Sequence, residues 1–180
     1  AHPGPAAANL STSRMIDDIA AAAGSPCQVY RSPVGEANVV SVMQQHNCVF
    51  GGEGNGGIID PRVVPVRDSL VAMALTLQLM ADSGRAISEL VASIPRYTMI
   101  KTKFECSKER IARVLAAVRD RYATHRVNDS DGVRVDFADG WVHVRGSNTE
   151  PIIRIIAEGA TPARTESLIA DVRAIADAIT

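Results

Sequence analysis

Apolar and polar positions alternate in two different ways along the chain, and the change falls near residue 95. Before it, short apolar runs typical of strands are separated by segments with apolar residues every three or four positions, which is typical of helices. Strands are expected at 6–10, 27–30, 48–50 and 58–59, and helices are expected to begin at Ser11 or Ser13, at Gly35 and at Asp68. This order predicts a layered α/β domain with a mostly parallel sheet over residues 1–94. The helix from 68 to 81 is apolar on most sides, so we expect it to be buried.

After residue 95 the pattern becomes that of an antiparallel sheet. Strands are expected at 97–105, 133–137, 141–145 and 152–158, with helices that begin at Ser107 and at Thr161-Pro162. Residues 95–180 therefore predict an α+β domain with an antiparallel sheet and helices on one face. Asp139-Gly140 is typical of a two-residue hairpin turn. Such a turn would place Asp136 opposite His143 and Arg134 opposite Arg145.

Composition and charge exclude several classes of protein. With 46% apolar and 22% charged residues, the chain is composed like a folded protein rather than a disordered one. Its formal net charge of −1 gives no overall attraction to nucleic acid or anionic membranes, so neither is an expected partner. The longest apolar run, 70–81, is too short to cross a bilayer. Cys27, Cys48 and Cys106 form no CxxC pair, and the histidines lack metal-ligand spacing. We therefore expect free, buried thiols in a reducing, cytoplasmic compartment and no metal site in the chain.

A glycine-rich segment follows the third predicted strand. Residues 52–57 read Gly-Glu-Gly-Asn-Gly-Gly and formally contain GxGxxG. Dinucleotide binding requires a helix to begin near Gly57, whereas Ile58-Ile59 and Pro61 predict a strand and a turn. The segment is then either a plain flexible turn or a tight loop that brings backbone close to a ligand. Glu53 and Asn55 suit sugar hydroxyls, because a carboxylate accepts hydrogen bonds and an amide both donates and accepts them.

A second chemical cluster spans residues 145–154. The guanidinium groups of Arg145 and Arg154 are planar forks that match phosphate. Ser147, Asn148 and Thr149 add hydroxyl and amide donors. If these groups converge, they form a site for a phosphate monoester. The alternative is an ordinary polar turn in which Arg154 pairs with Glu150 or Glu158. The remaining basic residues, Lys103 among them, interleave with acids and are expected on solvated faces.

Four segments in order resemble the C-terminal half of the α-D-phosphohexomutases, the family of phosphoglucomutase, phosphomannomutase and phosphoglucosamine mutase. They are residues 9–14 (Asn-Leu-Ser-Thr-Ser-Arg), 33–37 (Pro-Val-Gly-Glu-Ala), 52–57 and 145–151 (Arg-Gly-Ser-Asn-Thr-Glu-Pro). The form of the glycine-rich segment is most similar to the phosphomannomutase and phosphoglucosamine mutase types of archaea and some bacteria. The resemblance covers nearly the whole chain.

The resemblance implies a partial three-layer α/β domain, the third of four family domains, followed by the phosphate-binding fourth domain. It implies that Gly35, Glu36, Glu53 and Asn55 bind the sugar. It also implies that Arg145, Ser147, Asn148, Thr149 and Arg154 bind the non-reacting phosphate. Many members have Ser in place of Asn55 and some have His in place of Glu36, which leaves the preferred hexose open.

The resemblance further implies an isomerase that interconverts hexose 6-phosphate and hexose 1-phosphate through a 1,6-bisphosphate and a phosphoserine. The catalytic serine and the Mg²⁺-binding aspartates belong to earlier domains, so no catalytic or metal residue is expected in this chain. The chain is then a fragment, inactive alone, whose partners are hexose phosphates, hexose bisphosphates and the N-terminal domains of its parent. An exposed sheet edge or apolar face would favour self-association. The alternative is a non-catalytic module that binds sugar phosphates.

Overall fold

The computed structural model describes residues 3–147 and 149–179, which form two compact units, Ala1–Arg96 and Tyr97–Thr180. The N-terminal unit holds a four-stranded sheet and four helices. The C-terminal unit holds a five-stranded sheet and two helices. The predicted fold class, α/β followed by α+β, is confirmed.

The sheet of the N-terminal unit has the strand order β2-β1-β3-β4. Strand β1 (Ala6–Asn9) pairs in parallel with β2 (Val29–Ser32) on one side and with β3 (Phe50–Gly52) on the other. Strand β4 (Ile58–Ile59) is antiparallel to β3 and follows the glycine-rich loop directly. No helix therefore begins at Gly57, and a dinucleotide-binding loop is excluded there.

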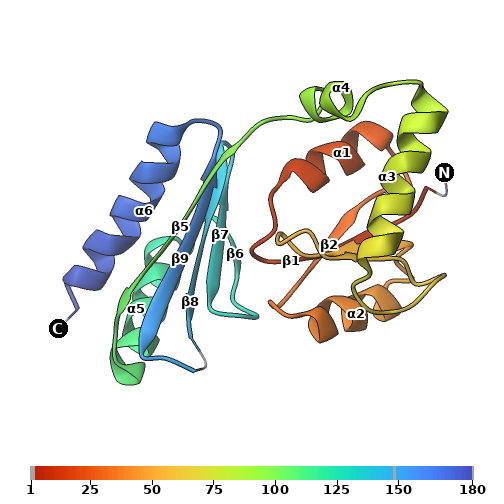
Figure 1. The fold of residues 1–180 in the computed structure, drawn as a ribbon. Coiled ribbons are helices and arrows are strands. Elements are labelled where there is room, and N and C mark those ends of the chain that lie inside the picture. Colours follow the sequence, from red (N-terminus) through yellow and green to blue (C-terminus); the bar gives the residue numbers. More distant parts are fainter. Residues whose placement is uncertain (1–2, 148, 180) are drawn as a thin grey trace. The chain divides into compact units, whose positions relative to one another are not determined.

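Helices α1 (Met15–Ala23) and α2 (Glu36–Gln45) lie on opposite sides of this sheet (Figure 1). Helix α2 packs on the sheet through Val39 and Met43, which are buried together with Ala7, Cys48 and Ile59. Strands β1 and β3 are parallel, and each runs into a loop at its carboxyl end. These loops, at residues 9–14 and 52–57, therefore come to the same edge of the sheet, since parallel strands share their carboxyl ends.

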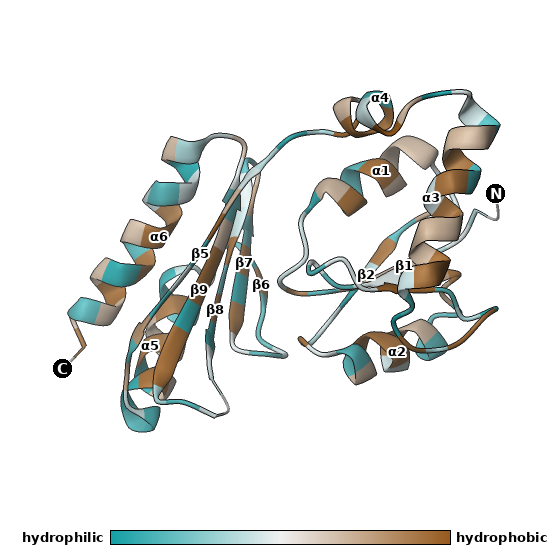
Figure 2. Ribbon diagram, viewed as in Figure 1, coloured by the Kyte–Doolittle hydropathy of each residue, from teal (hydrophilic) through white to brown (hydrophobic). Residues whose placement is uncertain are grey.

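Helix α3 (Ser69–Ser83) begins where predicted, because the Asp68 carboxylate accepts hydrogen bonds from Leu70 N at 2.8 Å and Val71 N at 3.0 Å. The expectation that this helix is buried was wrong. Leu70 is 73% exposed and Leu77 64% exposed, and Figure 2 shows the helix brown along much of its length. Its main neighbour is β4, a strand of two residues that cannot cover a helix of four turns. A short helix not expected from the sequence, α4 (Ile87–Ala92), follows. No helix in the described part of the chain is both long and apolar enough to span a bilayer.

The C-terminal unit is an antiparallel sheet with the order β5-β9-β8-β7-β6. Its strands are β5 (Thr98–Glu105), β6 (Arg126–Asn128), β7 (Val133–Phe137), β8 (Gly140–Gly146) and β9 (Ile152–Gly159). The short edge strand β6 was not predicted. Helices α5 (Lys108–Arg121) and α6 (Pro162–Asp177) are capped by Ser107 and Thr161, as the sequence predicts.

The core of this unit lies between the two helices and the sheet. Val114 and Val118 of α5 and Leu168 and Val172 of α6 are buried against alternate residues of the strands. Those strand residues are Val133, Val135, Val142, Val144, Ile153, Ile155 and Ala157. Because successive side chains of a strand point to opposite faces, the intervening residues of β8 and β9 lie on the face away from the helices. That face carries Arg145 and Arg154.

The hairpin between β7 and β8 is two residues out of step with the prediction. Val135 pairs with Val142, Arg134 with His143 and Phe137 with Gly140, so the turn is Ala138-Asp139. The predicted pairs Asp136–His143 and Arg134–Arg145 were wrong. Gly140 is needed inside the strand, because a Cβ there would lie 2.4 Å from the Glu158 carbonyl oxygen of β9. The glycine therefore permits close strand approach instead of forming the turn.

Candidate functional site

The glycine-rich loop is a closed, ordered turn rather than a flexible one. Glu53 N donates to Gly57 O at 3.0 Å, and Gly56 N donates to Glu53 O at 3.1 Å. The Asn55 Oδ1 atom accepts from Gly57 N at 3.1 Å, so this side chain braces its own loop. A Cβ on Gly54 would lie 3.2 Å from Ser11 O, which shows how closely the loop packs against residues 11–12.

Glu53 is held in one orientation by contacts to both carboxylate oxygens. Asn9 Nδ2 donates to Oε1 at 2.8 Å, and Arg67 Nη1 lies 3.2 Å from Oε2. Asn9 is itself fixed, since its Oδ1 accepts from Ser11 N at 3.0 Å and from Thr12 Oγ1 at 2.9 Å. The Glu53 side chain is only 7% exposed. Each carboxylate oxygen retains a lone pair, so the group is a preorganised acceptor for hydroxyl groups.

Arg67 connects Glu53 to Glu36, the first residue of α2. Arg67 Nε donates to Glu36 Oε2, and the Arg67 backbone N lies 3.3 Å from the same oxygen. These hydrogen bonds lower the pKa of the Glu36 carboxyl below its usual value and raise that of Arg67. Gly35, at φ +123°, forms the N-cap of α2 and sets the position of Glu36. The structure thus brings Glu36 and Glu53 together, with Gly35 beside Glu36.

Sequence reasoning missed Arg67 and the role of Asn9. Glu53 lies in a predicted loop without a lysine or arginine within eight positions, and Glu36 lies at the predicted start of a helix. Acidic side chains without a close basic neighbour in sequence are a signal that a cation from elsewhere in the chain pairs with them. Arg67 immediately precedes Asp68, the cap of α3, and so could have been identified as a residue fixed at the end of a loop.

In the C-terminal unit, cations from three adjacent strands align. Arg145 of β8 is the register partner of Arg154 of β9, and Arg154 is the partner of Lys103 of β5. Register partners point to the same face of a sheet. Like charges directly opposite one another are destabilising, so this row favours the binding of an anion. Lys103 is exposed, as expected, but its place in this row could not be read from the sequence.

Each arginine of this row has a carboxylate neighbour. Arg145 Nε lies 3.3 Å from Asp131, and the Arg145 side chain is 18% exposed. Arg154 Nη2 lies 3.7 Å from Glu150, and both side chains are about half exposed. The alternative pairing of Arg154 with Glu150 is therefore present. An exposed pair of this kind contributes about 0.2–1 kcal/mol, so it does not prevent Arg154 from binding an anion.

The loop that follows β8 is organised around Ser147. Its Oγ lies 3.3 Å from Glu150 N and 3.4 Å from both Thr149 N and Thr149 Oγ1. Ser147 N donates to Ile152 O at 2.9 Å, which closes the loop onto β9. The hydroxyl groups of Ser147 and Thr149 therefore lie together at the end of the strand that carries Arg145. Asn148 lies outside the described residues.

His143, the buried histidine of this unit, is not suited to acid–base chemistry at neutral pH. His143 is fully buried, and its Nε2 lies 2.6 Å from the Asp131 carbonyl oxygen. Burial lowers the pKa of His143 to about 4, so the imidazole is neutral. In the described part of the chain, no three His, Cys, Asp or Glu side chains come together as a metal site. Cys48 and Cys106 are free and buried, whereas Cys27 is free but only half-buried, contrary to expectation.

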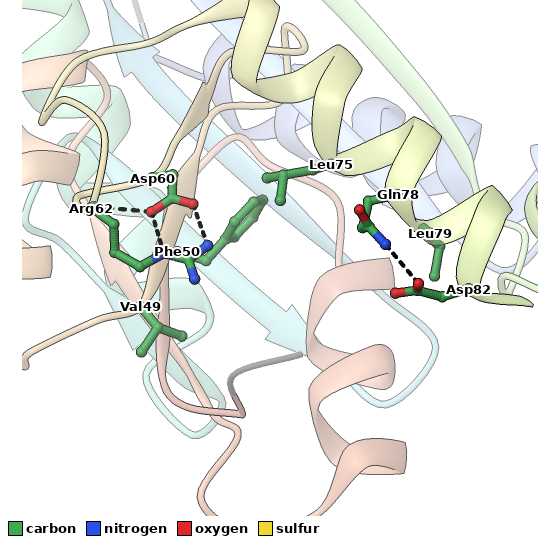
Figure 3. A pocket seen from close by; sticks show the side chains of 8 residues that line it. All are labelled: Val49, Phe50, Asp60, Arg62, Leu75, Gln78, Leu79 and Asp82. Carbon is green, nitrogen blue, oxygen red and sulfur yellow. Dashed lines mark hydrogen bonds and ion pairs between the residues drawn. The ribbon is translucent and has the colours of Figure 1, made fainter.

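A pocket of about 730 Å³ lies elsewhere in the N-terminal unit, between α3 and the start of β3 (Figure 3). None of the predicted sugar-binding residues lines it. Its charged groups are already paired: Arg62 donates from Nε to Asp60 Oδ1 at 2.9 Å, and Gln78 donates to Asp82 at 2.6 Å. The pocket is lined by Val49, Phe50, Asp60, Arg62, Leu75, Gln78, Leu79 and Asp82.

Comparisons with known proteins agree with the two-unit organisation. Residues 1–97 match the family described as "Phosphoglucomutase/phosphomannomutase, alpha/beta/alpha domain III", and residues 99–175 match "Phosphoglucomutase/phosphomannomutase, C-terminal domain". A Methanopyrus kandleri protein named "Probable phosphoglucosamine mutase" is 39% identical over 92% of this chain. A Thermococcus kodakarensis protein named "Phosphoglucomutase/phosphomannomutase" is 38% identical over 83% of it.

The structural comparison extends over the same regions. The crystal structure of a phosphoglucomutase/phosphomannomutase family protein from Burkholderia thailandensis shares the fold over 98% of this chain, with a TM-score of 0.81 at 21% identity. The matched region is 38% of that protein. The chain likewise spans 37% of the Methanopyrus kandleri relative and 32% of the Thermococcus kodakarensis one. The chain therefore belongs to the phosphoglucomutase/phosphomannomutase family, of which it carries the third domain and the C-terminal domain.

Proposed function

We propose that this chain supplies the substrate-recognition part of a phosphohexomutase, an isomerase that interconverts hexose 6-phosphate and hexose 1-phosphate. The observation that carries the proposal is the register of β8 and β9. It sets Arg145 and Arg154 side by side on one sheet face, next to the hydroxyl groups of Ser147 and Thr149. Two planar guanidinium groups with adjacent hydroxyl donors suit the three oxygens of a phosphate monoester.

The N-terminal unit supplies groups suited to the sugar. Glu36 and Glu53 can accept hydrogen bonds from hydroxyl groups. Gly35 and the glycines of residues 52–57 carry no side chain that would block a ligand from reaching these carboxylates. Asn55 keeps its Nδ2 for a ligand, because only its Oδ1 is used by the loop. Glucose, mannose and glucosamine all offer hydroxyl groups to such acceptors, so the proposal covers the hexose phosphates as a class.

The chemical contribution of these residues is positioning. Holding the non-reacting phosphate and the sugar hydroxyls converts an encounter into an oriented complex. In phosphoryl transfer, positioning and charge stabilisation account for nearly all of the protein's contribution. A site that binds whichever phosphate is not reacting would hold a 1,6-bisphosphate in either of its two orientations.

The phosphoserine and Mg²⁺ of the proposed reaction are assigned to other domains of a longer parent chain. Among the described residues, no three His, Cys, Asp or Glu side chains come together. The free thiols support a reducing, cytoplasmic setting for this function. A non-catalytic sugar-phosphate-binding module is the alternative. It predicts that the parent chain binds hexose phosphates without converting glucose 1-phosphate to glucose 6-phosphate.

Calorimetric titration of the 180-residue chain with inorganic phosphate and with glucose 6-phosphate tests the proposal. Arg145→Ala and Arg154→Ala are expected to weaken phosphate binding at least about tenfold, because each removes a charge-assisted contact worth about 1.5–3 kcal/mol. Arg119→Ala, which removes an exposed arginine of α5, is the matched control and should bind as wild type does. Equal affinities in all four proteins would refute the phosphate site.

A further inference from the structure

We propose that Arg67 contacts the sugar directly, as the hydrogen-bond donor of a Glu36–Arg67–Glu53 cluster that recognises adjacent hydroxyl groups of a hexose. This inference rests on the proposed function and adds a residue to it. The cluster is the set of contacts already described: Arg67 Nε to Glu36 Oε2, and Arg67 Nη1 to Glu53 Oε2 at 3.2 Å.

Arg67 is fixed along its whole length. Its backbone N lies 3.3 Å from Glu36 Oε2, and the next residue, Asp68, donates its N–H to Ile58 O at 2.9 Å. The aliphatic stem packs over the backbone of Gly57. A Cβ on that glycine would lie 2.2 Å from Arg67 Cδ and 2.8 Å from its Cγ. The last glycine of the loop therefore leaves space for the arginine, and the arginine is tied to the loop that presents Glu53.

The cation of the cluster is more exposed than either of its two anions. The Arg67 side chain is 43% exposed, the Glu36 side chain 30% and the Glu53 side chain 7%. A ligand that approaches Glu53 therefore also meets the guanidinium group. A guanidinium carries more N–H donors than the two contacts to the carboxylates use. Arg67 thus retains donors that are not needed to hold the cluster together.

The chemistry of the ligand explains why such donors are useful. Each sugar hydroxyl donates one hydrogen bond and also offers lone pairs. Carboxylates alone can only accept, so the lone pairs of a hydroxyl bound between Glu36 and Glu53 would lose their water without gaining a protein donor. Leaving such groups without a hydrogen-bond partner weakens binding. Arg67 is placed to donate to those lone pairs.

The competing explanation is that Arg67 only braces the two loops. The two roles differ in their dependence on the ligand. If Arg67 only braces the loops, its substitution weakens the binding of every sugar to the same degree. If Arg67 donates directly to a sugar hydroxyl, its substitution weakens only the binding of sugars that carry that hydroxyl. Glucose 6-phosphate and its 3-deoxy and 4-deoxy analogues separate the two cases in a double-mutant-type cycle.

The experiment measures the affinity of the full 180-residue chain for these three ligands and for inorganic phosphate. The variants are Arg67→Met and Arg67→Lys. Arg62→Met is the matched control, because Arg62 is another exposed arginine paired with a carboxylate in the same segment. Arg67→Met is expected to weaken glucose 6-phosphate binding about tenfold and to leave inorganic phosphate binding unchanged. With one of the two deoxy analogues the effect of the substitution should disappear. Arg67→Lys, which keeps the charge, is expected to lose less.

NMR titration of the Glu36 carboxyl shows that each substitution acts at the intended contact. In Arg67→Met the pKa of Glu36 should rise toward that of an ordinary glutamate, and in Arg62→Met it should stay low. Equal losses for all three sugars in Arg67→Met, or no loss at all, would overturn the direct contact. Absence of phosphate binding in the wild-type chain would instead refute the proposed function, so the two failures are distinguishable.

Discussion

Substitution of Gly132 tests the packing that places Arg145. Gly132 directly precedes β7 and has φ +72°. A Cβ at this position would lie 2.2 Å from the Val144 carbonyl oxygen and 2.9 Å from Arg145 Cα, both in the backbone of β8. Gly132→Ala therefore forces β7 and β8 apart at the end of β8 that carries Arg145 and leads into the loop of Ser147 and Thr149.

The expected cost has two parts. A non-glycine residue in the left-handed region loses about 1–2 kcal/mol. Displacing a packed backbone to admit an extra carbon costs about 1–3 kcal/mol more. The free energy of unfolding of the C-terminal unit should therefore fall by about 2–5 kcal/mol. For a domain of this size each kcal/mol corresponds to about 4–8 °C, so the unfolding midpoint should drop by at least about 10 °C.

Urea and thermal unfolding followed by tryptophan fluorescence provide the assay. Trp141, the single tryptophan of the chain, is fully buried in the C-terminal unit and reports its unfolding. Gly132→Asn separates the two costs, since asparagine tolerates the left-handed region but still carries a Cβ. We expect Asn to destabilise less than Ala, because it avoids most of the backbone cost, but still by about 1–3 kcal/mol from the contact of its Cβ. A Gly132→Ala protein within about 1 kcal/mol of wild type, or an Asn variant restored to wild type, would falsify the argument from backbone contact.

Three further predictions follow from particular contacts. Asp68→Ala should destabilise the N-terminal unit by about 1 kcal/mol in urea unfolding monitored by circular dichroism, because it removes the cap of α3; Asp82→Ala, at the other end of the helix, should not destabilise it. Between pH 6.5 and 4 the C-terminal unit should lose up to about 1.4 kcal/mol per pH unit, measured by tryptophan fluorescence in urea. The sign follows because the pKa of His143 is lowered to about 4 in the folded state, so the unfolded chain binds the extra proton as the pH falls. His143→Gln should flatten this dependence. Lys103→Gln should weaken phosphate binding about twofold to fivefold at low salt and less at high salt, because the ammonium is an exposed cation in the row with Arg154; Lys108→Gln should leave the titration unchanged.

Local patterns predicted most of the architecture. Period-two alternation predicted β5 and β7, the hairpin signal predicted β8 as the return strand, and an apolar run predicted β9. Capping residues such as Ser107 and Asp68 predicted helix starts. These signals are local, because a strand or a cap is decided by residues within a few positions. The two-residue error in the β7–β8 hairpin has a non-local cause. Gly140 is required by its contact with the Glu158 carbonyl on a strand far along the chain, and a turn rule that considers only neighbours cannot include that contact.

The same distinction applies to the candidate site. Glu53 and Arg145 stand out in the sequence because glycines surround them or hydroxyl residues follow them. Arg67 and Lys103 have no such local context. Arg67 joins the candidate site only because β4 and the segment before α3 bring the chain back beside the glycine-rich loop. Lys103 enters only because β5 pairs with β9 across about fifty residues of sequence.

The candidate groups of each unit have one electrostatic feature in common, because Arg67, Arg145 and Arg154 each already lie beside a carboxylate. Arg145 and Arg154, the two arginines in the row of cations on the C-terminal sheet, differ in how firmly they are held. Arg154 shares a half-exposed contact of 3.7 Å with Glu150, so an anion can replace that carboxylate at little cost. Arg145 is less exposed and lies closer to its carboxylate, 3.3 Å from Asp131, whose backbone carbonyl also contacts the buried His143. Arg145 is therefore the fixed member of the pair, set by the fold, and Arg154 is the adjustable one. An anion that bound to this row would therefore meet one arginine whose position the fold sets and one that can exchange its carboxylate partner for the anion.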